Sequence, residues 1–195
     1  MTGFGRTGKL FGCDHCGIRP DIMIMAKGNS SGYVPLGAVA TSGRVNAVFA
    51  DRPLLHLNTF AGHPVACAAG EAVLDILKEE DLCGNAARME PVLRYQFEAL
   101  AHDLPELLRV TVIGLMASIE VDGSACPDMP RLIRRIRHEA YVGGLLVRVN
   151  PDGARATAFF YPPLNVTADD LALGARALGR AFRAALDAKG EGIPR

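Results

Sequence analysis

The chain has 195 residues, of which 49% are apolar and 22% are charged, so it can build a packed core and is not a disordered chain. Lys and Arg together number 21, as do Asp and Glu, and this zero net charge argues against a generic binder of nucleic acid or of anionic membranes. Its apolar stretches are too short to span a bilayer, and five cysteines without a disulfide-framework spacing favour the reducing cytoplasm.

The first 19 residues are predicted to form turns and loops, and they contain two motifs that invite a functional interpretation. Gly3 to Gly8 has the spelling G-x-G-x-x-G, but the residues after it show no helical pattern. We therefore expect a turn with positive φ at its glycines, and not a dinucleotide site. Cys13 and Cys16 flank His15, but no second pair of ligands follows, so we expect no metal site and loop thiols without a role.

A buried strand is expected over residues 20–26, and Lys27 follows at its carboxyl end. In open α/β sheets, ligands bind beyond the carboxyl ends of the strands. Burial lowers the pKa of a lysine amine and makes it a usable nucleophile for carbonyl compounds. Lys27 is thus a candidate catalytic residue, and a lysine whose stem covers apolar surface is the structural alternative.

The next elements alternate between strands and helices. A short strand is expected at residues 39–41, and a strand that leads into a loop at residues 54–62. From Pro64 to about residue 80, apolar residues recur at helical spacing. A second helical segment covers residues 85–102, with Pro91 as a kink or a restart.

The last third of the chain mixes the two element types again. One or two strands are expected around Gly114, and a strand pair at residues 145–149 and 156–161. A helix over residues 131–142 should bury Leu132, Ile133, Ile136 and Ala140. A final amphipathic helix should begin with a capping box made by Thr167 and Asp170. The class is therefore α/β or α+β, with a boundary near residues 103–106.

Three segments carry a resemblance to a known family: TGFGRTGKLF, PDIMIMAKGNSSGYVPLGAV and NTFAGHPVACAAGEAVLDIL, in that order. Together they resemble class III aminotransferases, the pyridoxal-phosphate enzymes that include ω-amino acid:pyruvate transaminases. The resemblance continues more weakly in GLMASIEV, GLLVR and YPPLNVT. It implies an α/β fold of type I. Residues 1–103 would be the C-terminal half of the cofactor-binding large domain, with its mostly parallel sheet, and residues 104–195 the small C-terminal α/β domain.

The resemblance implies roles for three residues. Lys27 would hold pyridoxal 5'-phosphate as a Schiff base and move the proton while an amino group passes from an amine or amino acid to a keto acid such as pyruvate. Thr59 matches a threonine that reaches the cofactor phosphate of the neighbouring subunit, which implies a homodimer with shared sites. Arg148 matches a position where several members place an arginine for the substrate carboxylate.

Some family features are altered or lie outside the sequence. The aspartate that pairs with the pyridine nitrogen and the phosphate-binding loop would precede Met1. We therefore also consider a truncated, non-catalytic or partner-dependent subunit. Phe159 and Phe160 stand before PPL, where some relatives place an arginine, so an ornithine-type substrate is not expected. An aminomutase or a decarboxylase on the same scaffold is a further alternative.

Overall fold

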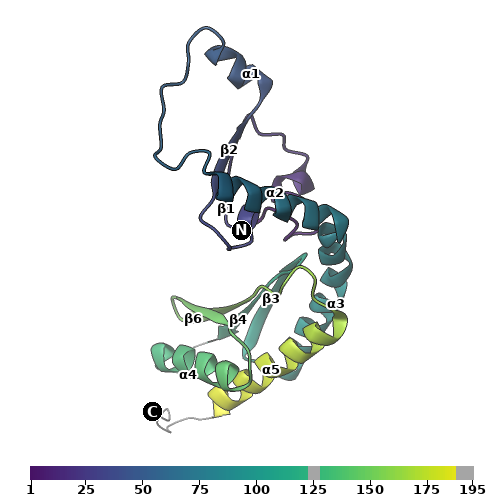
Figure 1. The fold of residues 1–195 in the computed structure, drawn as a ribbon. Coiled ribbons are helices and arrows are strands. Elements are labelled where there is room, and N and C mark those ends of the chain that lie inside the picture. The colour runs from purple at the N-terminus through teal and green to yellow at the C-terminus, as the bar shows by residue number, and fades with distance from the viewer. Residues whose placement is uncertain (123–127, 188–195) are drawn as a thin grey trace. The chain divides into compact units, whose positions relative to one another are not determined.

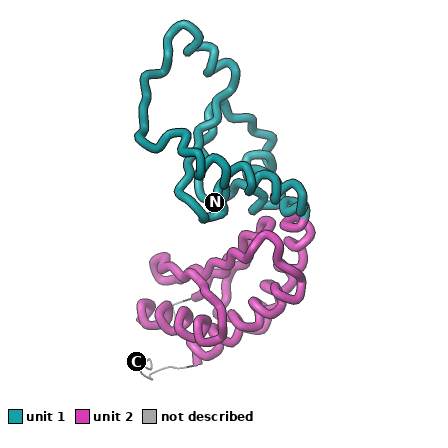
Figure 2. Tube along the Cα trace, viewed as in Figure 1, with its two compact units in different colours: residues 1–84 teal, residues 85–195 magenta. Residues whose placement is uncertain are grey.

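The computed structural model describes residues 1–122 and 128–187, which form two compact units, residues 1–84 and residues 85–195 (Figure 2). Each unit combines helices with strands (Figure 1), so the predicted α/β class is confirmed. All strand pairs in the described residues are antiparallel, so the parallel strands that the resemblance implies are not found in this part of the chain. The domain boundary that the sequence predicts between residues 103 and 104 stays a prediction.

The first unit contains a two-stranded antiparallel sheet. β1 (Ile22–Ala26) pairs with β2 (Gly37–Thr41), and Ala26 lies opposite Gly37. A 3₁₀ turn, Gly28–Ser30, lies in the connection between them. The short helix α1 (Gly43–Asn46) follows β2, and α2 (Pro64–Glu79) confirms the predicted helix that starts at Pro64.

β1 is not the buried strand that the sequence predicts. Its residues alternate between half-buried and exposed, and Ile24 is 82% exposed. The reason is that β1 has a single neighbouring strand among the described residues, and a two-stranded sheet leaves much of its surface uncovered. The strand expected within residues 54–62 is also wrong: this segment is a loop that ends in a turn, and Leu55 and Leu57 are almost fully exposed.

The second unit contains a four-stranded antiparallel sheet in the order β3-β4-β6-β5. β3 (Leu107–Ile113) and β4 (Met116–Asp122) form a hairpin, which confirms two strands around Gly114. β5 (Arg148–Asp152) and β6 (Arg155–Phe160) form the second predicted pair.

Among its described residues, this unit also contains most of α3 (Leu82–Asp103) and the helices α4 (Met129–Val142) and α5 (Ala168–Asp187). Buried and half-exposed residues alternate along β4, so one face of the sheet carries the apolar core. The core joins that face to all three helices, through side chains such as Phe97, Ile136 and Phe182. The four residues predicted to point inward from α4 are all buried: Leu132, Ile133, Ile136 and Ala140.

The local sequence explains how α5 begins, but it does not explain why α3 continues past Pro91. The predicted capping box is confirmed, because the Asp170 N–H donates to Thr167 Oγ1 and the Thr167 N–H donates to Asp170 Oδ2, both at 3.2 Å. α3 runs through Pro91 without a restart. Burial of Leu93 and Phe97 after the proline outweighs its local cost. No helix in residues 1–122 or 128–187 is long and apolar enough to cross a membrane.

Candidate functional site

Lys27 lies directly after β1, as the sequence predicts, and its backbone is unusual. Its φ is 68° and its ψ is −84°, a conformation that residues other than glycine rarely adopt. The Ser30 N–H donates to the Lys27 carbonyl oxygen at 3.3 Å and closes the turn behind it. A strained backbone of this kind persists only where the surrounding contacts fix it, and it is frequent at functional sites.

The loop after Lys27 has close neighbours on two sides, and each close contact involves a glycine. A Cβ on Gly28 would lie 3.0 Å from the Cβ and Cδ2 of Phe4, so the Phe4 side chain fits directly against the Gly28 backbone. A Cβ on Gly70 would lie 3.3 Å from the carbonyl oxygen of Asn29. Because Gly70 belongs to α2, the loop rests on that helix as well as on Phe4.

Phe4 is held by the N-terminal glycine turn. Gly5 and Gly8 have φ values of 87° and 84°, which confirms the predicted turn with positive φ at these two glycines but not at Gly3. The rings of Phe4 and Phe11 meet edge to face with their centroids 5.6 Å apart, and Phe4 is buried. The turn therefore supports the Lys27 loop, a role that the sequence analysis missed and that a phenylalanine between two glycines could have suggested.

Two buried polar residues follow Lys27, and the sequence analysis missed both. The Ser30 hydroxyl donates to the Val34 carbonyl oxygen at 2.6 Å. The side-chain nitrogen and oxygen of Asn29 are buried without a hydrogen-bond partner among the described residues. A buried unpaired amide costs about 1–3 kcal/mol, so this position is suited to a polar group that the described chain does not supply.

The side chain of Lys27 is exposed, which corrects the expectation that its amine is buried. The cause is the same as for β1, since the two-stranded sheet leaves the end of the strand uncovered. An exposed lysine amine on a fixed loop can form the covalent link that pyridoxal phosphate requires, so the loop fits that cofactor at this contact. Within the described ranges, no group of three or more His, Cys, Asp or Glu side chains could hold a metal ion.

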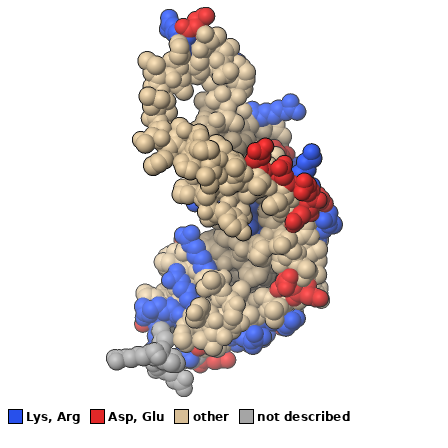
Figure 3. All heavy atoms as spheres, in the orientation of Figure 1, with Lys and Arg blue, Asp and Glu red and all other residues tan. Residues whose placement is uncertain are grey.

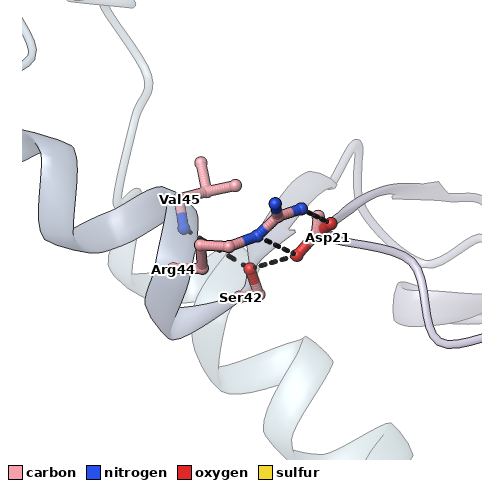
Figure 4. A network of polar contacts seen from close by, with 4 residues as sticks. All are labelled: Asp21, Ser42, Arg44 and Val45. Atoms are coloured by element: carbon pink, nitrogen blue, oxygen red, sulfur yellow. Dashed lines mark hydrogen bonds and ion pairs between the residues drawn. The ribbon is translucent and has the colours of Figure 1, made fainter.

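A polar network fixes the other end of the β1–β2 pair (Figure 4). Asp21 accepts a hydrogen bond from the Ser42 hydroxyl at 2.7 Å, and the Arg44 guanidinium donates to both of its carboxylate oxygens. Ser42 Oγ also accepts from the Val45 N–H and so caps α1. The hydrogen bond from Arg44, and then that from Ser42, lower the pKa of the Asp21 carboxyl.

Thr59 and Arg148 lie in different units. Thr59 is exposed in the turn that precedes α2, where the Ala66 N–H donates to His63 Nδ1 at 3.4 Å and the helix begins. Arg148 is the first residue of β5, and its Nε donates to Asn150 Oδ1 at 3.1 Å. The structure thus brings the Lys27 loop and α2 together in the first unit, while Arg148 belongs to the second unit. The roles of all three residues remain predictions.

This chain is similar to a known protein family and to several known proteins. The family model for class III aminotransferases matches residues 1–182. An uncharacterized aminotransferase, y4uB, from Sinorhizobium fredii (strain NBRC 101917 / NGR234) is 37% identical over 181 residues. That alignment covers 88% of this chain and 38% of the relative.

Solved structures of transaminases are also similar. An S-selective transaminase from Arthrobacter sp. has a TM-score of 0.86 at 30% identity, over 96% of this chain and 43% of its own. An amine transaminase from an uncultivated Pseudomonas species, solved in its PLP-bound form, has a TM-score of 0.81 at 36% identity, over 94% of this chain and 43% of its own. The chain therefore spans less than half the length of the relatives it matches.

Proposed function

Because the chain belongs to the class III aminotransferase family, we propose that it is part of a pyridoxal-phosphate-dependent transaminase that moves an amino group from an amine or amino acid to a keto acid such as pyruvate. The observation that carries the proposal is the position of Lys27 at the end of β1, on a strained loop that is packed between Phe4 and α2. When bound, the cofactor would supply an electron sink for the carbon from which a proton is removed.

Lys27 has two tasks in this proposal. Its Nζ would hold the aldehyde carbon of the cofactor when that group is bound. The free Nζ then takes a proton from the Cα of the substrate and later returns it. Both tasks need the amine at one position, and the contacts of Gly28 with Phe4 and of Asn29 with α2 fix the backbone that carries it.

Arg148 and Thr59 are proposed as binding residues. Arg148 is exposed at the start of β5, and a guanidinium can bind the carboxylate of an amino or keto acid through two parallel hydrogen bonds. Thr59 would donate its hydroxyl to the phosphate of a cofactor held by a second copy of the enzyme. The exposure of Leu57 and Phe60 beside it supports a homodimer in which this segment is covered.

A second candidate is a partner-dependent subunit without activity of its own, working in the cytoplasm like the first. It is supported by the exposed apolar side chains of the first unit, among which Ile24 is 82% and Leu55 is 95% exposed. On the face drawn in Figure 3, charged side chains are sparse over most of this unit. Apolar surface of this kind is normally covered by protein.

Trapping of the cofactor by reduction tests the proposal. The purified chain is mixed with pyridoxal phosphate, reduced with borohydride and digested, and the modified lysine is mapped by mass spectrometry. We expect modification to concentrate on Lys27, to be lost in Lys27→Ala and to persist in the control Lys78→Ala, whose side chain is exposed on α2. Equal modification of Lys9, Lys27 and Lys78 would contradict an organised site.

An assay of amino transfer to pyruvate separates the two candidates. Modification at Lys27 together with turnover supports the enzyme. Modification at Lys27 without turnover, and turnover only after a second polypeptide is added, supports the partner-dependent subunit.

A further inference from the structure

Arg148 and Asn150 lie on the same face of the sheet in the second unit. They are two positions apart on β5, and side chains at this spacing point to the same side of a strand. Val149, between them, points the other way and is fully buried in the core that joins the sheet to the helices. Arg148 and Asn150 therefore lie on the outer face of the sheet, turned away from this core. The outer face also carries the residues that continue their rows across the neighbouring strands, Phe159, Thr157 and Glu120.

Asn150 contacts the guanidinium of Arg148 at one defined nitrogen. Arg148 Nε donates to Asn150 Oδ1 at 3.1 Å. A guanidinium can bind a carboxylate through Nε and one terminal nitrogen, or end-on through both terminal nitrogens. Because Asn150 occupies Nε, the end-on pair Nη1 and Nη2 remains, and neither has a hydrogen-bond partner within residues 1–122 and 128–187.

Glu120, the acidic residue in the row of Asn150, is paired with other arginines. Its Oε2 lies 3.2 Å from Arg155 Nη1, and its Oε1 lies 3.9 Å from Arg109 Nη1. Arg148 is exposed and forms no ion pair with any described residue. Its charge is therefore available for an anion that comes from outside the described chain.

Phe159 stands beside Arg148 on the neighbouring strand. The two residues are opposite each other in register, and the Cβ atoms of such pairs are about 4.5–5.5 Å apart. The centroid of the Phe159 ring lies 5.9 Å from that of Tyr161, so two aromatic rings lie together on this side. Arg148 thus has a bulky neighbour across the sheet, while Asn150 holds its guanidinium along its own strand.

We propose that Asn150 is a positioning residue, which holds the Arg148 guanidinium so that Nη1 and Nη2 together bind the carboxylate of the amino or keto acid. This inference rests on the role proposed for Arg148 in the transaminase. It adds that the carboxylate binds end-on. It also adds that Asn150, which does not touch the substrate, sets the affinity for substrates that carry a carboxylate.

The motion of the Arg148 Nε–H group tests the contact without any cofactor. Nitrogen relaxation measured by NMR on the full chain reports how rigid this group is, and its signal is identified by its loss in Arg148→Lys. We expect a rigid group in the wild type, a mobile one in Asn150→Ala, and a rigid one in Asn150→Asp, whose carboxylate also accepts from Nε. Thr157→Ala, opposite Asn150 on the outer face, is the control and should leave the group rigid. Equal mobility in the wild type and Asn150→Ala would overturn the proposal.

Titration with pyruvate, followed by the NMR signal of its methyl group, tests the effect on binding. Asn150→Ala should weaken binding about three- to tenfold, which corresponds to the loss of one hydrogen bond. Asn150→Asp should weaken it further although Nε stays rigid, because the new carboxylate pairs with the guanidinium and repels the ligand. A residue that only stabilised β5 would not separate rigidity from affinity in this way. Pyruvamide, which carries no charge, should bind no more tightly to the wild type than to Asn150→Ala.

The same titration separates this inference from the function on which it rests. If Arg148→Ala weakens pyruvate binding and Asn150→Ala does not, the positioning role is overturned while the role of Arg148 stands. If Arg148→Ala has no effect, both are overturned. Neither measurement requires turnover.

Discussion

Gly28 and Phe4 are packed so closely that position 28 has no room for a side chain. A Cβ on Gly28 would lie 3.0 Å from two carbon atoms of the Phe4 side chain. Phe4 cannot easily move away, because it is buried, its φ is 56° and its ring is packed on Phe11. The residue after Lys27 is therefore constrained by the N-terminal turn.

We expect Gly28→Ala to destabilise the first unit by about 1–3 kcal/mol, because an added methyl group in a filled space forces the neighbours apart. Chemical unfolding followed by circular dichroism measures this change. Gly43→Ala is the matched control, since a Cβ on Gly43 meets no atom within 4 Å. Equal unfolding midpoints for the two variants would contradict the packing of Phe4 on Gly28.

Asn29 and Ser30 should respond to substitution in opposite ways. Asn29→Leu replaces an unpaired buried amide with an apolar group of similar size, so we expect stability to stay the same or rise by about 1 kcal/mol. Ser30→Ala removes the hydrogen bond to the Val34 carbonyl oxygen and should cost about 1 kcal/mol. The same unfolding measurement compares them. If Asn29→Leu loses as much unfolding free energy as Ser30→Ala does, the Asn29 side-chain amide has a hydrogen-bond partner after all.

The Asp21 network predicts a dependence on acid pH. The hydrogen bond from Arg44, and then that from Ser42, lower the pKa of Asp21 in the folded chain below the usual value of 3.8. A carboxyl whose pKa is depressed by folding adds stability above its unfolded pKa, and this stability is lost as pH falls through the folded pKa. Asp21→Asn should therefore be less stable than the wild type at neutral pH, and the difference should disappear at strongly acid pH.

Titration of the Asp21 carboxyl by NMR identifies the cause of the shift. We expect its pKa to return toward the usual value in Arg44→Ala and, to a smaller extent, in Ser42→Ala. A larger change in Ser42→Ala than in Arg44→Ala would show that the hydroxyl, and not the guanidinium, dominates.

In the proposed transaminase, Arg148 should control affinity for the keto acid. A hydrogen-bonded charged group contributes about 1.5–3 kcal/mol, so Arg148→Ala should raise KM for pyruvate by roughly ten- to a hundredfold. Arg148→Lys should recover only part of this loss, because an ammonium cannot make two parallel bonds to a carboxylate. Arg134→Ala, a change at an exposed arginine of α4 in the same unit, is the control. A change in kcat without a change in KM would argue against carboxylate binding.

The elements that could be predicted from the sequence are those with a strong local pattern. The helical spacing that starts at Pro64, the inward residues of α4 and the Thr167–Asp170 capping box are all reproduced in the structure. Each depends on residues within one or two turns of a helix. The position of Lys27 at the end of β1 is of the same kind, since a short apolar run with a lysine at its end is visible in the sequence.

The features that could not be predicted depend on contacts between distant segments. The apolar residues of β1 suggested burial, but burial depends on how many strands lie beside it, and the structure supplies one. The contact between Phe4 and Gly28 joins two residues that are far apart in the sequence. A periodic pattern of apolar residues therefore cannot predict it. Pro91 suggested a kink or a restart, but α3 continues through it without a restart, with Leu93 and Phe97 buried after it.

The apolar core of the second unit also determines when this part of the chain can become stable. Its buried members run from Ala86 in α3 to Ala185 near the end of α5. Phe182 and Leu178 of that last helix are among the most deeply buried side chains in the described chain. During synthesis the sheet therefore lacks an essential part of its cover until α5 has left the ribosome, so this unit is expected to fold late and in one cooperative step.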